Sequence, residues 1–355
     1  MARLGSDEFV VILKALDTKA EVAAQIAKGV AEKIHAAIKE PVDLVGQKYY
    51  CRACIGISLF SDHGTKAEDL VKQADAAMFQ AKQSGRDKIH FFNEDMQAAL
   101  EQRVQMEAWL RQAIPEQLRL VYQLQADHQK RVFGAEALIR WHHPQQGLIS
   151  PASFIPLAET TGLILQIGRW VLESVCRQLK DWENNSLTQD LIVSVNVSAK
   201  EFQQDNFVEQ VLDVVDQTGA RPDRLKLELT ESMLIENTEA TIAKMNALKE
   251  KGISFSLDDF GTGYSSLSYL KQLPLDQLKI DQSFIRDILT DPNDAAIVRT
   301  IIALGRTLGL NVVAEGVETG RQLDLLSAYG CYNFQGYLFG KPVAVDEFVQ
   351  QLLKI

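Results

Sequence analysis

The chain has 355 residues and a formal net charge of −10, with 37 Lys and Arg against 47 Asp and Glu. One hydrophobic core serves roughly 100 to 200 residues and an α/β barrel roughly 250, so two domains are expected. The negative field repels nucleic acid, so we expect no DNA or RNA duplex as a partner, and a phosphate ligand would need a metal or local arginines.

The cysteines are few and scattered, which argues against the disulfide framework of small secreted domains. Cys51 and Cys54 lie in a strand-like run at 49–58 and would point to opposite faces of a sheet, so a redox or metal role is not expected. No apolar stretch reaches the roughly 20 residues that span a bilayer, and no basic-then-apolar leader follows Met1. We therefore expect a cytoplasmic segment without membrane contact.

Residues 1–92 are predicted to form an α/β unit. After a hairpin-like start, the pattern predicts a helix from Lys19 to Ile38, the strand at 49–58 and a helix from Lys66 to Gln83. Residues 93–117 mix charged residues with Met, Leu and Trp109 at helical spacing. This connector helix must bury its apolar stripe against the following domain or against a second copy of itself.

From residue 118 to 355 the pattern alternates between strands and helices, which predicts a barrel. The expected strands are Leu120–Gln123, Val132–Ile139, Leu191–Val197, Leu225–Leu229, Ile253–Leu257, Leu278–Ile280, Val312–Ala314 and Tyr332–Gln335. Helical periodicity marks Gly168–Trp182, Phe207–Thr218, Glu239–Lys251, Ala295–Leu308 and Arg321–Ala328. The turn at 126–131 is too short for a parallel crossover, so the first two strands should pair antiparallel.

Acidic or amide side chains close the apolar runs of this second part, at Glu136, Asn196, Glu228, Asp258-Asp259 and Glu315. Barrel enzymes keep their chemistry at the carboxyl ends of the strands. Mg²⁺ and Mn²⁺ prefer such oxygen ligands, and a carboxylate shared by two ions holds them roughly 3.5 to 4 Å apart. The pattern therefore predicts a two-metal hydrolase site. Taken singly, such a residue is more often a helix N-cap or a solvated loop residue.

Two further segments bear on this site. Lys279 follows another apolar run and could lie beside a metal-bound water. The Gly-rich segment at 260–267 is either a flexible loop or a weak phosphate cradle. It lacks the Lys-Ser/Thr ending of a P-loop, so triphosphate binding there is not expected.

In order along the chain stand E-A-L-I-R-W-H-H-P, F-I-P-L-A-E, N-V-S, E-L-T-E-S, D-D-F-G-T-G-Y-S-S-L, L-K-I-D, V-A-E-G-V-E and Q-G-Y-L-F-G-K-P. With this series, residues from about 100 to 355 closely resemble the EAL-domain phosphodiesterases, which linearise cyclic di-GMP to pGpG. The resemblance implies a TIM-like (β/α)8 barrel with one antiparallel strand and two Mg²⁺ or Mn²⁺ ions. It also implies a homodimer that forms through this domain. The alternative is a catalytically silent receptor that binds cyclic di-GMP and signals through the connector helix.

The resemblance also implies residue roles. Glu136, Asn196, Glu228 and Asp258 would bind one metal, and Asp258, Asp259 and Glu315 the other, while Lys279 would position or activate the attacking water. Arg140 would contact a phosphate, and Gln123, Asp281, Glu318 and Gln335 would bind substrate or brace the metal ligands. Glu231 would anchor the D-D-F-G-T-G-Y-S-S-L loop. The departures from the family pattern, Leu124, Thr160 and Glu201 (where Gln is common), remove no metal ligand.

The N-terminal unit carries a second resemblance. R-L-G-S-D-E-F at 3–9, A-D-A-A-M-F-Q-A-K at 74–82 and G-R-D at 85–87 are similar to the later part of the GGDEF diguanylate cyclases, with Ser6 in place of a signature glycine. The first half of that domain, which supplies another metal-binding aspartate and part of the GTP pocket, is not recognised. Asp7 and Glu8 alone cannot build that site, so we expect a partial, degenerate unit without cyclase activity, as in a fragment of a longer sensor protein.

Overall fold

The computed structural model describes residues 1–5, 7–14, 16, 20–44, 47–60, 66–85, 87–92, 105–234, 238–261 and 270–354. The chain divides into two compact units, Met1–Met106 and Glu107–Ile355. The domain boundaries expected near residues 92 and 117 stay predictions.

The first unit is a small α/β assembly. Its helices α1 (Ala20–Lys39) and α2 (Ala67–Gln83) agree with the two predicted helices. The strands β1 (Ala2–Arg3) and β2 (Phe9–Val10) pair antiparallel, as do β3 (Val42–Leu44) and β4 (Gln47–Tyr49), whereas β5 (Ile55–Ile57) and β6 (Ile89–Phe91) pair parallel. Helix α2 buries Ala76, Ala77 and Ala81 and packs on β5 and β6, so the core of this unit lies there.

The prediction of a single strand at 49–58 is wrong, because this range is divided between two short strands. Tyr49 ends β4, whose partner is β3, whereas Ile55 begins β5, whose partner is β6. Residues 50–54 carry the chain between these two sheets and have no strand pairing. Cys51 is exposed and Cys54 is half-buried, and both are free thiols.

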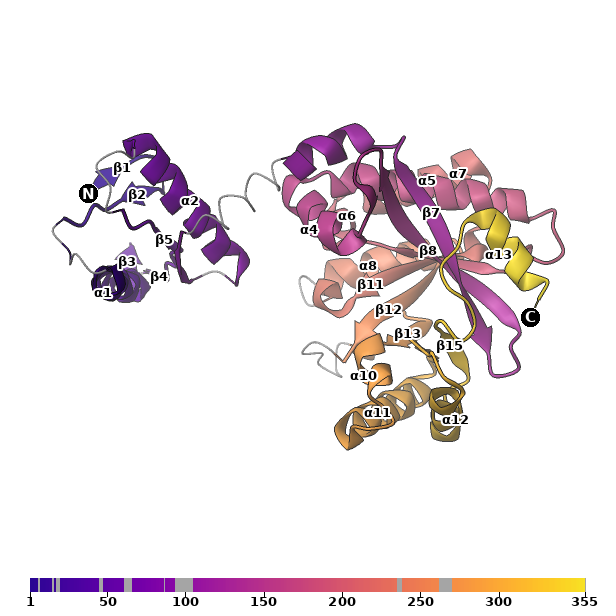
Figure 1. The fold of residues 1–355 in the computed structure, drawn as a ribbon. Coiled ribbons are helices and arrows are strands. Elements are labelled where there is room, and N and C mark those ends of the chain that lie inside the picture. Colours follow the sequence, from indigo (N-terminus) through magenta and orange to yellow (C-terminus); the bar gives the residue numbers. More distant parts are fainter. Residues whose placement is uncertain are drawn as a thin grey trace. The chain divides into compact units, whose positions relative to one another are not determined.

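The second unit is a closed eight-strand barrel, which confirms the predicted fold class (Figure 1). Its strands are β7 (Leu118–Asp127), β8 (Val132–His143), β10 (Ile192–Asn196), β11 (Leu225–Thr230), β12 (Ser254–Phe260), β13 (Gln277–Ile280), β14 (Asn311–Ala314) and β15 (Asn333–Gln335). Each of the eight expected strands matches one of them. β7 runs antiparallel to both of its neighbours, β8 and β15, and the β8–β10 pairing closes the barrel. A short strand β9 (Gly147–Ile149) extends β8 as a hairpin.

Helices surround this barrel (Figure 1). They are α4 (Pro151–Thr161), α5 (Ile164–Trp182), α6 (Ala199–Gln203), α7 (Phe207–Thr218), α8 (Thr238–Lys249), α10 (Gln282–Arg286), α11 (Pro292–Leu308), α12 (Gly320–Tyr329) and α13 (Val345–Leu352), with short 3-10 turns η1 (Pro222–Arg224) and η2 (Glu231–Leu234). Apolar side chains at helical spacing, such as Ile167, Val171 and Leu179 on α5, are buried. Over the described residues, no helix is both long enough and apolar enough to cross a membrane.

The connector region ends in a helix over 105–113, while residues 93–104 lie outside the described part of the chain. Leu110 and Ala113 of this helix are fully buried. The Trp109 ring lies 4.5 Å from the ring of His143, which ends β8. Of the two expected burial partners for the apolar stripe, the structure therefore shows the barrel unit.

Strand periodicity decides which side chains enter the barrel. On β11, Lys226 and Glu228 share one face, and Lys226 Nζ donates to Gln277 Oε1 of β13 at 3.0 Å, so this face points inward. Leu227, on the opposite face, borders α5 and α7. The barrel interior is thus polar at several levels, and its upper level is formed by the acidic side chains that the sequence singled out.

Candidate metal centre

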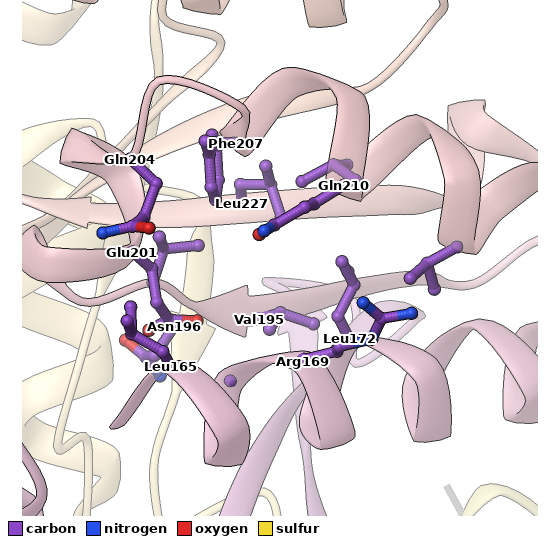
Figure 2. A pocket seen from close by; sticks show the side chains of 14 residues that line it. Leu165, Arg169, Leu172, Val195, Asn196, Glu201, Gln204, Phe207, Gln210 and Leu227 are labelled. Atoms are coloured by element: carbon purple, nitrogen blue, oxygen red, sulfur yellow. The ribbon is translucent and has the colours of Figure 1, made fainter. Parts of the chain in front are cut away.

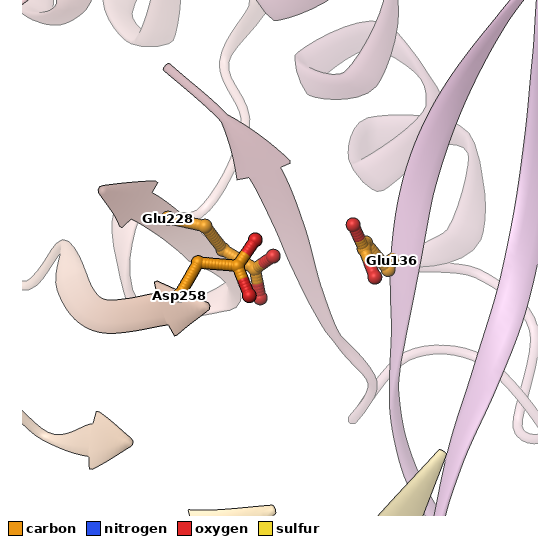
Figure 3. Close-up of side chains that lie close together, drawn as sticks. All are labelled: Glu136, Glu228 and Asp258. Carbon is orange, nitrogen blue, oxygen red and sulfur yellow. The ribbon is translucent and has the colours of Figure 1, made fainter. Parts of the chain in front are cut away.

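Carboxylates from separate strands meet at one end of the barrel. One ligand oxygen from each of Glu136, Glu228 and Asp258 lies within 4.8 Å of the others (Figure 3), and the same holds for Asp258, Asp259 and Glu315. Glu228 and Asp258 stand near the carboxyl ends of β11 and β12, and Glu315 directly follows β14. Glu136 instead lies inside β8, because β8 continues to His143 to pair with β7 and β9. The two groups share Asp258.

Lys279 lies in the centre of this cluster. Its Nζ is 2.6 Å from Glu228 Oε2, 2.6 Å from Glu315 Oε1, 3.0 Å from Asp258 Oδ1 and 3.3 Å from Glu136 Oε2. The Lys279 side chain is only 1% exposed. A buried ammonium is stable only when it is paired, and here four carboxylates surround it.

One ammonium does not neutralise four carboxylates, three of them buried and that of Glu315 half-buried, and the pKa values reflect this. Burial favours the neutral amine, but the surrounding carboxylates raise the pKa of Lys279 well above its ordinary value. Burial, opposed by Lys279, raises the pKa of Glu228 to about 8 and that of Glu315 well above its ordinary value. Burial would also raise the pKa of Glu136, yet Lys279 and the amides of Gln335 and Asn196 lower it.

Amide side chains orient Glu136. Asn196 Nδ2 donates to Glu136 Oε1 at 2.7 Å, and Gln335 Nε2 donates to Glu136 Oε2 at 2.5 Å. Gln335 Nε2 also donates to Gln123 Oε1 at 3.2 Å, and Gln125 Nε2 donates to Gln335 Oε1 at 2.9 Å. Because the amide of Asn196 donates through its nitrogen, its carbonyl oxygen remains available as a ligand.

This donor set fits divalent cations of the Mg²⁺ and Mn²⁺ type, which bind carboxylate and carbonyl oxygens. Glu228 Oε1 is buried and has no hydrogen-bond partner among the described residues. An orphaned carboxylate oxygen in a low-dielectric interior is costly unless a cation approaches it. The excess of negative charge over Lys279 and this orphan oxygen both point to bound metal.

Asp259 and Asp281 lie at the edge of the cluster. Asp259 has a positive φ of 53° and is half-buried. Burial, together with the nearby carboxylates of Asp258 and Asp281, raises the pKa of Asp259 to about 6. Asp281 caps α10, where it accepts from the backbone N–H of Ser283 at 2.9 Å. Asp281 therefore caps a helix in this structure, and its carboxylate lies near that of Asp259 in the cluster.

The remaining predicted site residues lie further out. Arg140 follows Glu136 on the same face of β8 and donates to the Ile139 carbonyl at 2.8 Å; burial lowers its pKa. Glu231 Oε2 accepts from the N–H of Gly261 at 3.4 Å, at the start of the Gly-rich segment, and the rest of that segment, 262–267, lies outside the described residues. Glu318 is exposed and is not in either group of clustered carboxylates that the described residues form.

Buried polar residues beside the cluster, among them Gln125 and Lys226, were not predicted from the sequence. Gln125 supports Gln335, and Lys226 lies one level below Glu228. The signal for Gln125 was present, because Gln123 and Gln125 occupy alternate positions of one strand and so share a face. Lys226 had a comparable signal in the alternation Lys226, Glu228.

Comparisons with protein families give two matches. The EAL domain family matches residues 107–342, and the family described as Diguanylate cyclase, GGDEF domain, matches residues 1–88. MucR of Pseudomonas aeruginosa, described as a bifunctional diguanylate cyclase/cyclic di-GMP phosphodiesterase, is 42% identical over 98% of this chain and 50% of its own length. NbdA of the same organism, described as a cyclic di-GMP phosphodiesterase, is 41% identical over 99% of this chain and 44% of its own length. The chain thus spans about half the length of these relatives.

Comparison with solved structures of similar proteins supports the barrel fold. One described as "PaMucR Phosphodiesterase, c-di-GMP complex" is 46% identical, with a TM-score of 0.67 over 69% of this chain and 99% of that chain. The EAL enzyme Bd1971 in its cGMP-bound form is 34% identical, with a TM-score of 0.68 over 73% of this chain and 71% of that chain. The FimX EAL domain of Pseudomonas aeruginosa, at 23% identity and a TM-score of 0.61, supports the fold alone.

Proposed function

The chain belongs to the EAL domain family, and from this membership we propose that it is a metal-dependent phosphodiesterase that hydrolyses cyclic di-GMP to linear pGpG. The observation that carries the proposal is the buried cluster in which Lys279 faces four carboxylates at the mouth of the barrel. Relatives at 41% to 42% identity are described as cyclic di-GMP phosphodiesterases, which supports the same substrate.

The proposed ligand sets follow the two groups of carboxylates. Glu136, Glu228 and Asp258, joined by the carbonyl oxygen of Asn196, would hold one Mg²⁺ or Mn²⁺ ion. Asp258, Asp259 and Glu315 would hold the second. Two such ions, when bound, lower the pKa of water and stabilise the attacking and leaving oxygens of an in-line displacement at phosphorus.

Lys279 serves as a hydrogen-bond donor in this proposal. The surrounding carboxylates raise its pKa, which favours the ammonium form, and this form offers three N–H donors. It can orient that water and stabilise negative charge that develops on it. Gln335 and Asn196 keep Glu136 in position through its two oxygens.

The substrate carries two phosphodiester charges into a protein whose net charge is −10. Local cations are therefore needed for binding. We assign Arg140 to a substrate phosphate, because a guanidinium offers a planar fork of donors that matches phosphate oxygens. Gln123, Asp281 and Gln335 complete the proposed contacts, and Glu318 is proposed to support the metal ligands.

A direct test incubates the purified protein with cyclic di-GMP and Mg²⁺ or Mn²⁺ and separates the products by chromatography. We expect linear pGpG with either ion and none in the presence of a chelator. Measurable binding of cyclic di-GMP without any product under both ions would instead identify a receptor that signals through the connector helix.

We further propose that the barrel forms homodimers and that the loop anchored by Glu231 links the dimer contact to the metal centre. The hydrogen bond from Gly261 to Glu231 supports the anchoring role. Light scattering over a range of protein concentrations should show a dimer. A protein that remains monomeric and fully active at every concentration would rule out this role for the loop.

A further inference from the structure

A pocket of about 100 Å³ lies behind β10, between this strand and the helices α5, α6 and α7. Its lining includes Asn196, Glu201 and Gly168, and Figure 2 shows Asn196 and Glu201 at the same end of it. Glu201 is the one carboxylate among the residues that line this pocket. The metal centre described above makes no use of it.

Glu201 holds the turn that follows the metal ligand Asn196. Its Oε2 accepts from the backbone N–H of Ser198 at 3.0 Å and from the Ser198 hydroxyl. In return, the Ser198 Oγ accepts from the N–H of Glu201 at 3.3 Å. This reciprocal capping box begins α6 and ties the side chain of Glu201 to the second residue after Asn196.

The carboxylate of Glu201 has room only because residue 168 is a glycine. A Cβ built on Gly168 would overlap both oxygens of Glu201. Glycine in the interior of a helix costs roughly 0.5 to 1 kcal/mol relative to alanine, and Gly168 lies inside the 19-residue helix α5. The close approach of Glu201 to this helix gives the glycine a packing function.

The turn between β10 and α6 is fixed from both sides. The N–H of Val197 donates to the Glu228 carbonyl at 3.0 Å, and the N–H of Ser198 donates to Glu201. Asn196 precedes these two residues and reaches Glu136 with its amide. We propose that Glu201, which packs against Gly168, is a positioning residue that orients the side-chain carbonyl of Asn196 toward the metal. This inference rests on the proposed metal chemistry.

The charge state of Glu201 should modulate this function. Burial raises the pKa of Glu201 to about 6, while its hydrogen bonds with Ser198 oppose the shift and Glu159 of α4 adds to it. Lys200 of α6 donates to the Thr160 carbonyl, and Arg169 of α5 pairs with Glu173. The residues of α7, β10 and β11 that line the described pocket are uncharged.

Ionisation and the capping box are linked. Because the Ser198 bonds lower the pKa of Glu201, loss of its proton must strengthen those bonds. A charge-assisted hydrogen bond is roughly twice as strong as a neutral one. Asn196 is therefore held more firmly above about pH 6 than below it, independently of the protonation of the metal ligands themselves.

The first test compares Glu201→Gln with the wild-type chain in calorimetric titrations with Mn²⁺ alone, at about pH 5 and about pH 8. Gln keeps the size and the acceptor but does not titrate. We expect the variant to bind Mn²⁺ roughly three- to tenfold more weakly at the higher pH and equally at the lower pH. At each pH, the dissociation constant of the variant is divided by that of the wild-type chain. This ratio removes the effect of ligand protonation, which both proteins share. Glu209→Gln, on the exposed face of α7, is the matched control.

The second test displaces the carboxylate from the other side. Gly168→Ala should weaken Mn²⁺ binding, whereas the same change combined with Glu201→Ala should add little to the effect of Glu201→Ala alone. Gly29→Ala, in α1, where a Cβ meets nothing within 4 Å, controls for a helix glycine as such. Two results would overturn the inference. One is a ratio of the Glu201→Gln to the wild-type dissociation constant that is the same at both pH values, and the other is an unchanged Mn²⁺ affinity of Gly168→Ala.

These readouts measure metal binding and not turnover. If the wild-type chain binds Mn²⁺ but fails to hydrolyse cyclic di-GMP, the proposed reaction fails and the positioning role is still decided by the titrations. Conversely, normal hydrolysis together with equal Mn²⁺ affinity in Glu201→Gln at both pH values removes the positioning role alone.

Discussion

At the level of single residues, the centre balances charge only in part. Lys279 contacts four carboxylates, while Glu228 keeps one oxygen without a partner among the described residues. Buried charges left in this state oppose folding, and a cation that binds them stabilises the folded chain. If these side chains bind metal as proposed, stability and function depend on the same residues.

Replacing Glu136 tests the ligand assignment. Glu136→Ala removes a metal ligand and the acceptor of the Asn196 and Gln335 amides, so we expect turnover of cyclic di-GMP to fall at least roughly a hundredfold. Product formation should be followed by chromatography, with circular dichroism as the check on folding. Glu209→Ala, on the exposed face of α7, should retain activity. An unchanged rate in Glu136→Ala would show that the site is assigned wrongly.

The pH dependence of stability tests the electrostatics. An unfolded glutamate loses its proton near 4.5, whereas burial raises the pKa of Glu228 to about 8 in the folded chain. Between these values the folded state binds more protons, so the free energy of unfolding of the metal-free protein should fall as pH rises, by roughly 2 to 4 kcal/mol. Urea unfolding in a chelator should show this decline, and Mn²⁺ should reduce it. Stability that rises through this window would contradict the prediction.

At the level of elements, the ends of the strands are held by contacts with neighbouring segments. The N–H of Val317, after β14, donates to the Gln335 carbonyl at 3.1 Å, and Leu338 N–H donates back to the Val317 carbonyl at 3.0 Å. Gly336 lies between these contacts, with its Cα against the Val317 backbone. The segment after β15 thus helps to hold Gln335 next to Glu136.

Gly336→Ala should disturb this arrangement, because its Cβ would overlap backbone atoms of Val317 that cannot rotate away. We expect a loss of roughly 2 kcal/mol or more in the free energy of unfolding, measured by urea denaturation. Gly320→Ala, at the first turn of α12, meets nothing within 4 Å and should be close to neutral. Equal stability of the two variants would show that the close approach at Gly336 relaxes without cost.

The sequence predicted these elements well where a period was visible. All eight strand runs lie in barrel strands, and the short turn before Val132 correctly required an antiparallel pair. Periodicity did not reveal where a strand changes sheets, so 49–58 was predicted as one strand. Periodicity also does not predict which side chains of different strands come into contact. The contact of Gln335 with Glu136 joins residues 199 positions apart, and only the closed barrel shows it.

At the level of the whole molecule, the chain combines two compact units. The barrel unit holds every residue of the candidate metal centre, and the first unit matches a different family over residues 1–88. Both units align with the curated relatives, which are about twice as long as this chain. Metal binding should therefore affect the two units differently.

Scanning calorimetry can test this division. We expect two transitions, of which Mn²⁺ raises only the one that belongs to Glu107–Ile355, because a ligand stabilises the unit that binds it in the folded state. Raising the Mn²⁺ concentration should shift that transition further. A single transition that moves as a whole would indicate that the units unfold together.

The antiparallel strand β7 has a consequence for how the barrel forms during folding. β7 and β8 are adjacent in the chain and make a local hairpin, which closes at a small entropic cost. The pairing of β7 with β15 joins the two ends of the barrel and must await almost the entire domain. Gln123 and Glu136 come from the early hairpin and Gln335 from the last strand, so the metal centre is completed at the closing step. Tight metal binding would then report the final stage of folding, and a chain that stops short of β15 should bind metal more weakly because Glu136 loses the Gln335 contact.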